Sequence, residues 1–174
     1  RMVLINNSPS KEIIQLIGEE NIGVTFISNQ INLGFTGGVN QGMEYAMEHD
    51  ADYIWLLNND VEVPAECLGN LITEIESDKR IGLLSPVIVD PGTPQYPFFG
   101  RNVDTDNGQM LNAYDEKTYL EWLSREPWKI ELWGTALMIN KNLVNAIGYL
   151  DNDFFAYYED NDYSFRSNQA GFLN

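Results

Sequence analysis

The sequence predicts an α/β domain with a mixed, mostly parallel sheet flanked by helices and a Rossmann-like N-terminal half. Short runs of β-branched and aromatic residues alternate with segments whose apolar residues recur at helical spacing, which is typical of βαβ units. A glycine-rich turn at residues 32–38 joins a strand to a helix. The apolar run at residues 54–57 breaks into the polar cluster 58–60, and open α/β sheets bind ligands beyond the carboxyl ends of their strands.

In the first half of the chain, strands are expected at residues 3–5, 24–27, 54–57 and 81–89. An apolar face predicts a helix over residues 13–17 that stops near Gly18. His49 is expected to end the helix that follows the glycine-rich turn. Pro64 is expected to begin a further helix with four apolar residues on one face: Leu68, Leu71, Ile72 and Ile75.

The second half is richer in loops. Asp-Asn-Gly at residues 106–108 is a hairpin signal, and residues 114–128 suggest a short helix within a long loop. Residues 128–139 are strand-like. Helices are expected at residues 142–147, ending at Gly148, and at residues 160–170, ending at Gly171. We expect a single domain over residues 1–174, with a nucleotide-binding half at 1–90 and an acceptor half at 91–174.

Composition excludes several classes of function. A net charge of −16 over 174 residues argues against nucleic acid as a partner. It also means that a bound diphosphate would need a cation or local backbone donors to offset repulsion. The single cysteine, Cys67, and the single histidine, His49, exclude an internal disulfide and argue against a zinc cluster or a Ser-His-Asp site. Without a run of 18 apolar residues or a signal peptide, we expect no transmembrane segment in this chain and a cytoplasmic location, with any membrane association made through partners or missing segments.

Three segments offer chemistry, and each also has a purely structural interpretation. The glycines at residues 34–38 suit an anion at a helix N-terminus, or simply a tight turn. Asp60 suits a divalent cation shared with a phosphate, or a turn carboxylate. Glu159 and Asp160 suit a helix cap or, in apolar surroundings, a general base. Asp162 is spaced for an i,i+4 ion pair with Arg166.

Four segments, in this order, resemble the inverting glycosyltransferases of family 2, which have the GT-A fold, and especially their rhamnosyltransferase-like bacterial members. The matching segments are Asn32-x-Gly34-Phe35-x-x-Gly38-x-Asn40-x-Gly42, Leu56-Leu57-Asn58-Asn59-Asp60, Trp133-Gly134-Thr135-Ala136-Leu137-Met138-Ile139, and Gly148-x-x-Asp151-x-x-Phe154-Phe155-x-Tyr157-Tyr158-Glu159-Asp160-x-Asp162-x-x-x-Arg166. Any one segment is weak evidence for the family, whereas the four segments in this order are specific for it and extend over nearly the whole chain.

The resemblance implies a role for each matching position. Asp60 would bind Mg²⁺ or Mn²⁺ on the donor diphosphate, and Asp160 would be the general base with Glu159 beside it. The donor nucleotide or its sugar would be lined by Asn6, Asn32, Gly34, Phe35, Gly38, Asn40, Asn58 and Asn59. The acceptor side would be formed by Gly134, Thr135 and Asp162.

Several departures from the family pattern accompany the resemblance. Asn6 stands where the family usually has a base-recognising aspartate, and Asn58 replaces the first carboxylate of its Asp-x-Asp motif. The strand before Val3 and the usual C-terminal segment, where a histidine can complete the metal site, are missing. We therefore expect a truncated domain with weak or no activity of its own.

The resemblance implies transfer of a sugar, with inversion, from a UDP- or dTDP-sugar to an acceptor hydroxyl. The acceptor would be a saccharide or lipid-linked saccharide in bacterial surface-polysaccharide synthesis. One alternative is a nucleotide-sugar-binding module without catalysis. A nucleotidyltransferase is a second, although residues 29–42 lack the basic residue that its phosphate loop usually has. A scaffold is the third, and it would leave Asp60 and Asp160 far apart.

Overall fold

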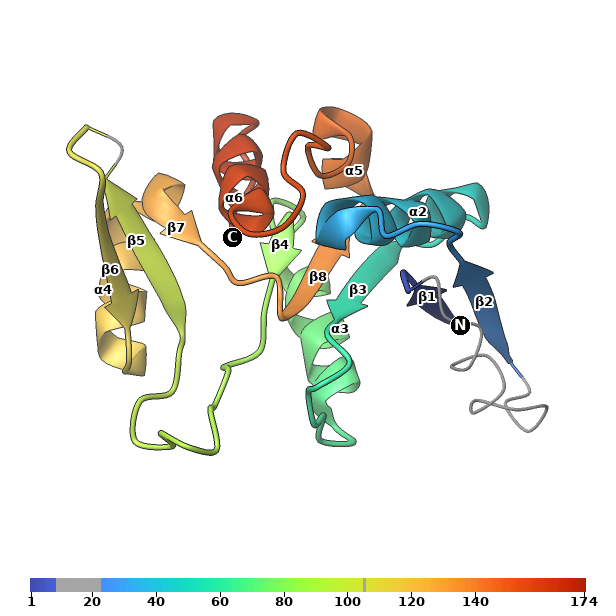
Figure 1. The fold of residues 1–174 in the computed structure, drawn as a ribbon. Coiled ribbons are helices and arrows are strands. Elements are labelled where there is room, and N and C mark those ends of the chain that lie inside the picture. The colour runs from blue at the N-terminus through green and yellow to red at the C-terminus, as the bar shows by residue number, and fades with distance from the viewer. Residues whose placement is uncertain (9–22, 105) are drawn as a thin grey trace. The chain divides into compact units, whose positions relative to one another are not determined.

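A computed structural model describes residues 1–8, 23–104 and 106–174 (Figure 1). The chain divides into two compact units: unit 1 is Arg1–Ala51 with Tyr149–Glu159, and unit 2 is Asp52–Gly148 with Asp160–Asn174. These units differ from the functional halves expected at 1–90 and 91–174, which remain a prediction. In the described part of the chain, no helix is both long enough and apolar enough to cross a membrane.

In unit 1, strand β1 (Met2–Asn6) pairs in parallel with β2 (Val24–Ser28), from Met2 opposite Val24 to Asn6 opposite Ser28. Both strands confirm the sequence prediction. Helix α2 (Gly34–Glu48) packs on β1, and His49 is its C-terminal cap, as predicted. The helix expected at residues 13–17 lies outside the described residues.

Unit 2 is built around a three-stranded sheet in the order β3 (Tyr53–Leu57), β8 (Ala136–Asn140) and β4 (Leu83–Leu84). Both outer strands run antiparallel to β8, all of whose residues are buried. Helix α3 (Cys67–Ser77) covers the sheet by packing Leu71 and Ile75 against Met138. In the described ladders, parallel pairing between strands is confined to β1–β2. The expected predominance of parallel pairing is therefore absent from unit 2, because β8 arrives from the second half of the chain and runs opposite to β3.

A second sheet of unit 2 has the order β6 (Gln109–Ala113), β5 (Gly100–Asp104) and β7 (Ile130–Glu131), with antiparallel pairing throughout. The β5–β6 hairpin and helix α4 (Glu116–Arg125) confirm their predictions. The 3₁₀ turn η1 (Pro127–Lys129) leads into β7. Helix α5 (Lys141–Ile147) ends at Gly148, and α6 (Glu159–Gln169) is followed by Gly171, both in the left-handed region as expected.

Several predicted boundaries were wrong. The strand expected at 81–89 is reduced to Leu83–Leu84 with isolated bridges at Ile81 and Ile88, because Pro86 has no N–H to donate to a ladder. The strand-like run 128–139 is divided into β7 and β8 by a turn. Helix α3 begins at Cys67 rather than Pro64, and Leu68, expected on its buried face, is exposed.

Candidate active site

The end of strand β3 lies against the turn that precedes β8. Leu57 pairs with Ala136, and the backbone N–H of Asn58 donates to the carbonyl of Thr135 at 3.0 Å. Asn59 and Asp60 follow as an exposed turn. The predicted strand-end carboxylate is therefore present, on a turn whose start is fixed by antiparallel pairing.

The same turn contacts the first turn of α6. The backbone N–H of Gly134 donates to Asp160 Oδ2 at 2.9 Å, and the N–H of Asn161 donates to Asp160 Oδ1 at 2.9 Å. Each carboxylate oxygen thus accepts one backbone hydrogen bond and keeps acceptor capacity for another. The half-buried Asp160 is held in one orientation without losing its capacity to accept a proton.

These two contacts connect three of the predicted site segments within unit 2. Asn58 binds Thr135, and its neighbour Gly134 binds Asp160. The strand end that carries Asp60 and the helix start that carries Asp160 are therefore joined through a single turn.

Glu131, which the sequence reasoning missed, lies close to the proposed base. It lies buried on β7, and Asn161 Nδ2 donates to its Oε2. Burial raises the pKa of the Glu131 carboxyl, and the nearby charge of Asp160 raises it further, whereas the Asn161 hydrogen bond and Arg101 act in the opposite direction. The available signal was a single acidic residue inside an otherwise apolar run.

One face of α6 holds the segment that contains Glu131 and Gly134. Ser164 Oγ accepts from the N–H of Leu132 at 3.2 Å, and Asn168 Nδ2 donates to the carbonyl of Ile130 at 2.9 Å. Their spacing matches the α-helical repeat, so they lie on the same face of the helix. These two hydrogen bonds fix the backbone at Ile130 and Leu132 relative to helix α6, which carries Asp160.

Asp162 forms the ion pair that its spacing suggested. Arg166 Nε donates to Asp162 Oδ2 at 2.7 Å, and Arg166 Nη1 donates to the carbonyl of Ile147 at 3.0 Å. The carboxylate therefore braces α6 against the end of α5. Its role on the acceptor side remains a prediction.

In unit 1, Asn7 organises the segment before α2. Its Oδ1 accepts from Asn29 Nδ2 at 3.1 Å and from the N–H of Leu33 at 3.0 Å. Its Nδ2 donates to Asn32 Oδ1 at 3.0 Å and to the carbonyl of Gly34 at 2.5 Å. The sequence reasoning assigned Asn32 to the donor site but missed Asn7, which fixes the loop around it.

Gly34 occupies a position that requires glycine. Its φ is +77°, and a Cβ at this position would lie 2.2 Å from the carbonyl oxygen of Phe155. The same oxygen accepts from the N–H of Phe35 at 2.8 Å. Because α2 begins at Gly34, Phe35 and Gly38 belong to the helix rather than to the loop expected at residues 32–38.

Asn40 joins the same two segments one turn further along α2. Its Nδ2 donates to the carbonyl of Leu150 at 2.9 Å and to Asn152 Oδ1 at 3.0 Å, and its Oδ1 accepts from the N–H of Leu150 at 3.0 Å. This buried side chain thus has a structural role in unit 1. A contact with the donor remains a prediction for Asn40.

The remaining predicted residues of unit 1 are Asn6 and Glu159. Asn6 is buried at the end of β1, where its Nδ2 donates to Ser28 Oγ at 3.2 Å and its Oδ1 accepts from the N–H of Ser8 at 3.1 Å. Glu159 is buried at the first position of α6. Both side chains are therefore held within the protein, and their roles toward the donor and acceptor remain predictions.

The residues around Asp60 fit a cation that is shared with a substrate. In the described part of the chain, no three His, Cys, Asp or Glu side chains gather in a group that could hold a metal ion by themselves. Asp60 is exposed at a strand end next to the amides Asn58 and Asn59. Mg²⁺ is commonly held by one or two carboxylates, substrate phosphates and water, so this donor set suits such a cation.

The chain is an α/β domain in which helix α2 begins at a glycine and carboxylates stand just beyond strand β3 and at the start of α6. The chain belongs to glycosyl transferase family 2, which it matches over residues 1–148, and this family has the GT-A fold. The low-salt glycan biosynthesis hexosyltransferase Agl10 of Haloferax volcanii is 26% identical over 168 residues, which cover 95% of this chain and 52% of that protein. The galactofuranosyltransferase GlfT1 of Mycolicibacterium smegmatis is 22% identical over 94 residues, which cover 54% of this chain and 31% of that protein. The chain thus spans about half the length of Agl10 and less of GlfT1.

Proposed function

We propose that this chain is the catalytic domain, or a large part of it, of a protein that transfers a hexose, with inversion, from a UDP- or dTDP-sugar to a hydroxyl of a saccharide or lipid-linked saccharide. The transfer would serve surface-polysaccharide synthesis, and its rhamnosyltransferase-like motifs suggest a place among such enzymes. Membership of glycosyl transferase family 2 supports this proposal. The observation that carries it is the carboxylate of Asp160, oriented by two backbone N–H groups beside the turn that meets the end of β3.

In the proposed reaction, Asp160 accepts the proton of the acceptor hydroxyl. The acceptor oxygen then forms a bond to the anomeric carbon of the sugar, while the bond from that carbon to the diphosphate oxygen breaks with its electron pair on the diphosphate. The proton ends on Asp160 and the charge on the leaving nucleoside diphosphate. Inversion follows because the nucleophile and the leaving group lie on opposite faces of the sugar, and one positioned base suffices.

Asp60 would hold Mg²⁺ or Mn²⁺ at the donor diphosphate, with Asn58 and Asn59 as neighbouring amides. Such a cation, when bound, offsets the negative charge that develops on the leaving diphosphate. A protein with a net charge of −16 has particular need of this compensation. The neutral amides of unit 1, Asn6, Asn32 and Asn40, are proposed to face the nucleotide or sugar without adding repulsion.

A calorimetric titration of UDP and dTDP into the chain, with and without Mn²⁺, tests the donor site. We expect binding that depends on Mn²⁺ and is weakened at least about tenfold by Asp60→Ala, because the substitution removes a direct ligand charge. Asp106→Asn is the matched control, since it removes an exposed carboxylate at the tip of the β5–β6 hairpin. Equal binding by Asp60→Ala and the unaltered chain would remove the metal assignment.

A further inference from the structure

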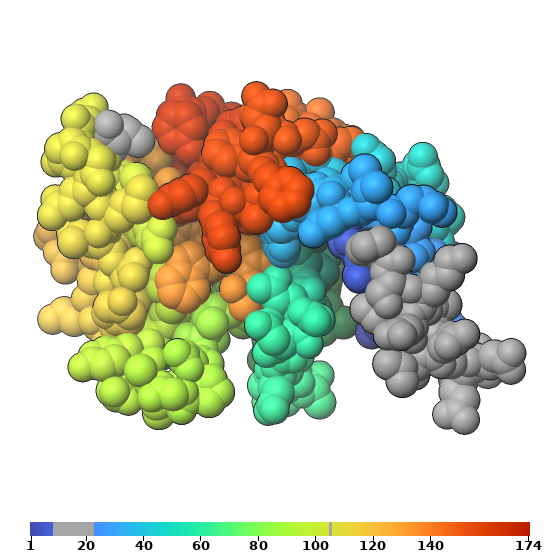
Figure 2. Space-filling model, in the orientation of Figure 1, coloured from blue at the N-terminus to red at the C-terminus, as the bar shows by residue number. Residues whose placement is uncertain are grey.

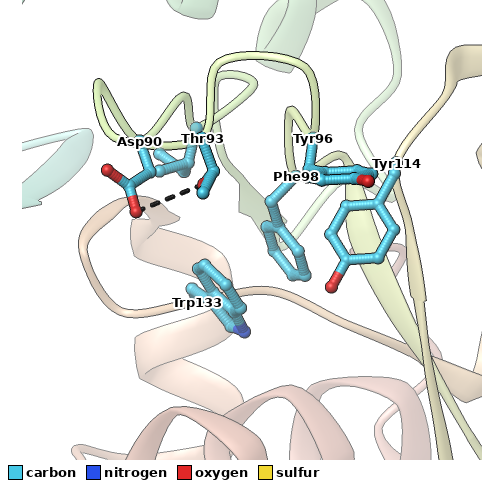
Figure 3. Close-up of a pocket in the computed structure, with 7 residues that line it drawn as sticks. Asp90, Thr93, Tyr96, Phe98, Tyr114 and Trp133 are labelled. Atoms are coloured by element: carbon cyan, nitrogen blue, oxygen red, sulfur yellow. Dashed lines mark hydrogen bonds between the residues drawn. The ribbon is translucent and has the colours of Figure 1, made fainter.

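A cavity of about 360 Å³ opens in unit 2. We call it the aromatic pocket, and it is lined by Ile88, Asp90, Thr93, Tyr96, Phe98, Tyr114 and Trp133. Figure 3 shows Phe98 and Trp133 between the Asp90–Thr93 turn at one end and the two tyrosines at the other.

The aromatic side chains form a rigid base and an exposed rim. Phe98 is buried and stacks on Trp133, with ring centroids 3.6 Å apart and ring planes 10° apart. Tyr96 and Tyr114 meet edge to face at 5.7 Å and are 56% and 46% exposed. Aromatic side chains gathered around a cavity with a few polar groups are typical of a ligand-binding pocket.

The loop that forms one wall of the pocket is fixed at its base. Ile88 and Phe98 exchange two backbone hydrogen bonds, at 3.0 and 2.8 Å, which close the segment between them into a loop. Within it, Asp90 accepts from the N–H of Gly92 at 2.8 Å. In Figure 2 this loop is the yellow-green surface at the lower left. The aromatic pocket is therefore largely preformed.

The hydroxyl of Tyr114 is arranged to donate a hydrogen bond. Arg101 Nε donates to Asn112 Oδ1 at 3.0 Å, and Asn112 Nδ2 donates to the Tyr114 hydroxyl oxygen at 3.0 Å. Because the tyrosine oxygen already accepts a hydrogen bond, its own proton remains for a ligand. The carboxylate of Asp90 supplies acceptor oxygens at the opposite end of the pocket.

We propose that the aromatic pocket binds a sugar ring of the acceptor and selects a neutral sugar over one that carries a carboxylate. The inference rests on the proposed transferase function, because it places the acceptor beside Asp160. Trp133 lines the pocket, and the next residue, Gly134, donates its N–H to Asp160. A ring held in the pocket therefore lies next to the turn that orients the base.

The chemistry of the lining fits a carbohydrate. Aromatic faces bury the C–H surface of a sugar ring, while a few convergent polar groups pair with its hydroxyls. Asp90 accepts from sugar hydroxyls, and Tyr114 donates to a ring or hydroxyl oxygen. The seven lining residues include one carboxylate and no cation. Arg101 lies over the ring of Trp133 at 5.9 Å, but its Nε donates to Asn112. A uronic acid would therefore meet the charge of Asp90 inside the pocket, with the Arg101 guanidinium outside the lining as partial compensation.

Direct binding to the chain tests the pocket without donor or metal. The probes are methyl β-glucoside, methyl β-galactoside and methyl β-glucuronide, followed by saturation-transfer NMR and by Trp fluorescence. We expect at least one neutral glycoside to bind, and the glucuronide to bind at least about fivefold more weakly. Tyr96→Ala and Tyr114→Ala should each weaken neutral binding about fivefold, the size expected for one aromatic contact.

Phe165→Ala is the matched control, because Phe165 is an exposed aromatic on α6 that does not line the pocket. Asp90→Asn should reduce the difference in affinity between the glucoside and the glucuronide, because it removes the charge that repels the glucuronide. The proposal is overturned if no neutral glycoside binds, if the glucuronide binds equally well, or if the tyrosine variants bind as tightly as Phe165→Ala.

The outcomes separate this inference from the proposed function. Loss of glycoside binding in the tyrosine variants, with Mn²⁺-dependent UDP or dTDP binding unchanged, supports the aromatic pocket. In a transfer assay the same variants should raise the KM for the acceptor at least fivefold, with the KM for the donor and the hydrolysis of donor by water unchanged. Glycoside binding in a chain that binds neither nucleotide would overturn the transferase function and the acceptor role together, leaving a sugar site.

Discussion

The side-chain contacts described for the two units differ in chemistry, although unit 1 also carries the buried carboxylate Glu159 and unit 2 the amides Asn58 and Asn59. In unit 1 neutral amides make these contacts: Asn7 fixes the loop before α2, and Asn40 binds the segment at Leu150. Around the proposed base in unit 2 the groups are carboxylates, with Asp160 held by backbone N–H groups and Glu131 buried beside it. Amides can both donate and accept without charge, whereas carboxylates can take protons and cations.

This difference agrees with the proposed function, in which residues of unit 1 contact the donor and Asp160 of unit 2 is the base. A protein with a net charge of −16 repels an anionic donor, so neutral amides in unit 1 order backbone without adding to that repulsion. Unit 2 needs a proton acceptor, which an amide cannot provide. The predictions below exchange the two chemistries or remove the residues that hold them in place.

The largest effect is expected from Asp160→Asn, which replaces the proposed base with an amide. Transfer should fall by about 10²–10⁴-fold, the usual contribution of a general base, while UDP or dTDP binding should stay within about twofold of the unaltered chain. Transfer rates with a saturating donor and calorimetric titration of the nucleotide measure the two quantities. Asp106→Asn serves again as the control, and equal rates in Asp160→Asn and this control would refute the base assignment.

The second prediction concerns the backbone of unit 1. Gly34→Ala should lower the free energy of unfolding by about 2–4 kcal/mol, because a Cβ would approach the Phe155 carbonyl oxygen to 2.2 Å at a φ of +77°. Urea unfolding followed by circular dichroism measures it. Gly69→Ala, in open space within α3, should raise stability by about 0.5–1 kcal/mol. Destabilisation of similar size in both variants would show that steric contact at Gly34 is not the cause.

Local patterns predicted the elements well where one rule acted alone. Strands β1, β2 and β3 and the hairpin turn depend on β-branched runs and Asp-Asn-Gly, so the expected positions were confirmed. The run at 128–139 was misjudged because Gly134 must turn to present its N–H to Asp160, a contact 26 residues away in sequence. The antiparallel place of β8 depends likewise on long-range pairing that no local pattern encodes.

The third prediction exchanges the chemistry of unit 1. Asn40→Asp removes the Nδ2 donor to Leu150 and Asn152 and places a carboxylate against the Leu150 carbonyl. The free energy of unfolding at pH 7 should fall by about 2–3 kcal/mol, as for a buried hydrogen bond replaced by an unpaired acceptor. The buried carboxyl should have a raised pKa, so the loss should shrink as the pH falls and the group becomes protonated. Asn107→Asp, in the exposed hairpin turn, is the control. A pH-independent loss would contradict this account.

Some residues of the candidate site can be recognised from their neighbours in the sequence, whereas others depend on partners that are distant in the sequence. Asp60 and Asp160 could be proposed from sequence because each stands where an element changes type, just beyond a strand and at a helix start, and their roles stay predictions. Asn7 and Glu131 were missed because their importance lies in partners far along the chain, such as Gly34 for Asn7 and Asn161 for Glu131. A polar residue inside an apolar run is a signal of burial, but it does not reveal its partner.

The smallest effect is expected from Glu131→Gln, which makes unit 2 resemble unit 1 by placing an amide in the buried position. Burial raises the pKa of Glu131 above its ordinary value near 4.5, so the folded protein binds this proton more tightly than the unfolded chain does. Its contribution to stability is complete below that ordinary value and is lost as the pH rises through the raised pKa. Glutamine cannot ionise, and its side-chain oxygen can still accept from Asn161. The variant should therefore match the melting temperature of the unaltered chain at pH 4 and exceed it by about 2–4 °C at pH 8.

Scanning calorimetry between pH 4 and pH 8 measures the difference in melting temperature, with Glu74→Gln on the exposed face of α3 as the control. A variant that is less stable at pH 8 than at pH 4, relative to the unaltered chain, would show that the Glu131 charge stabilises the site, because its attraction to Arg101 would then exceed the cost of its burial beside Asp160.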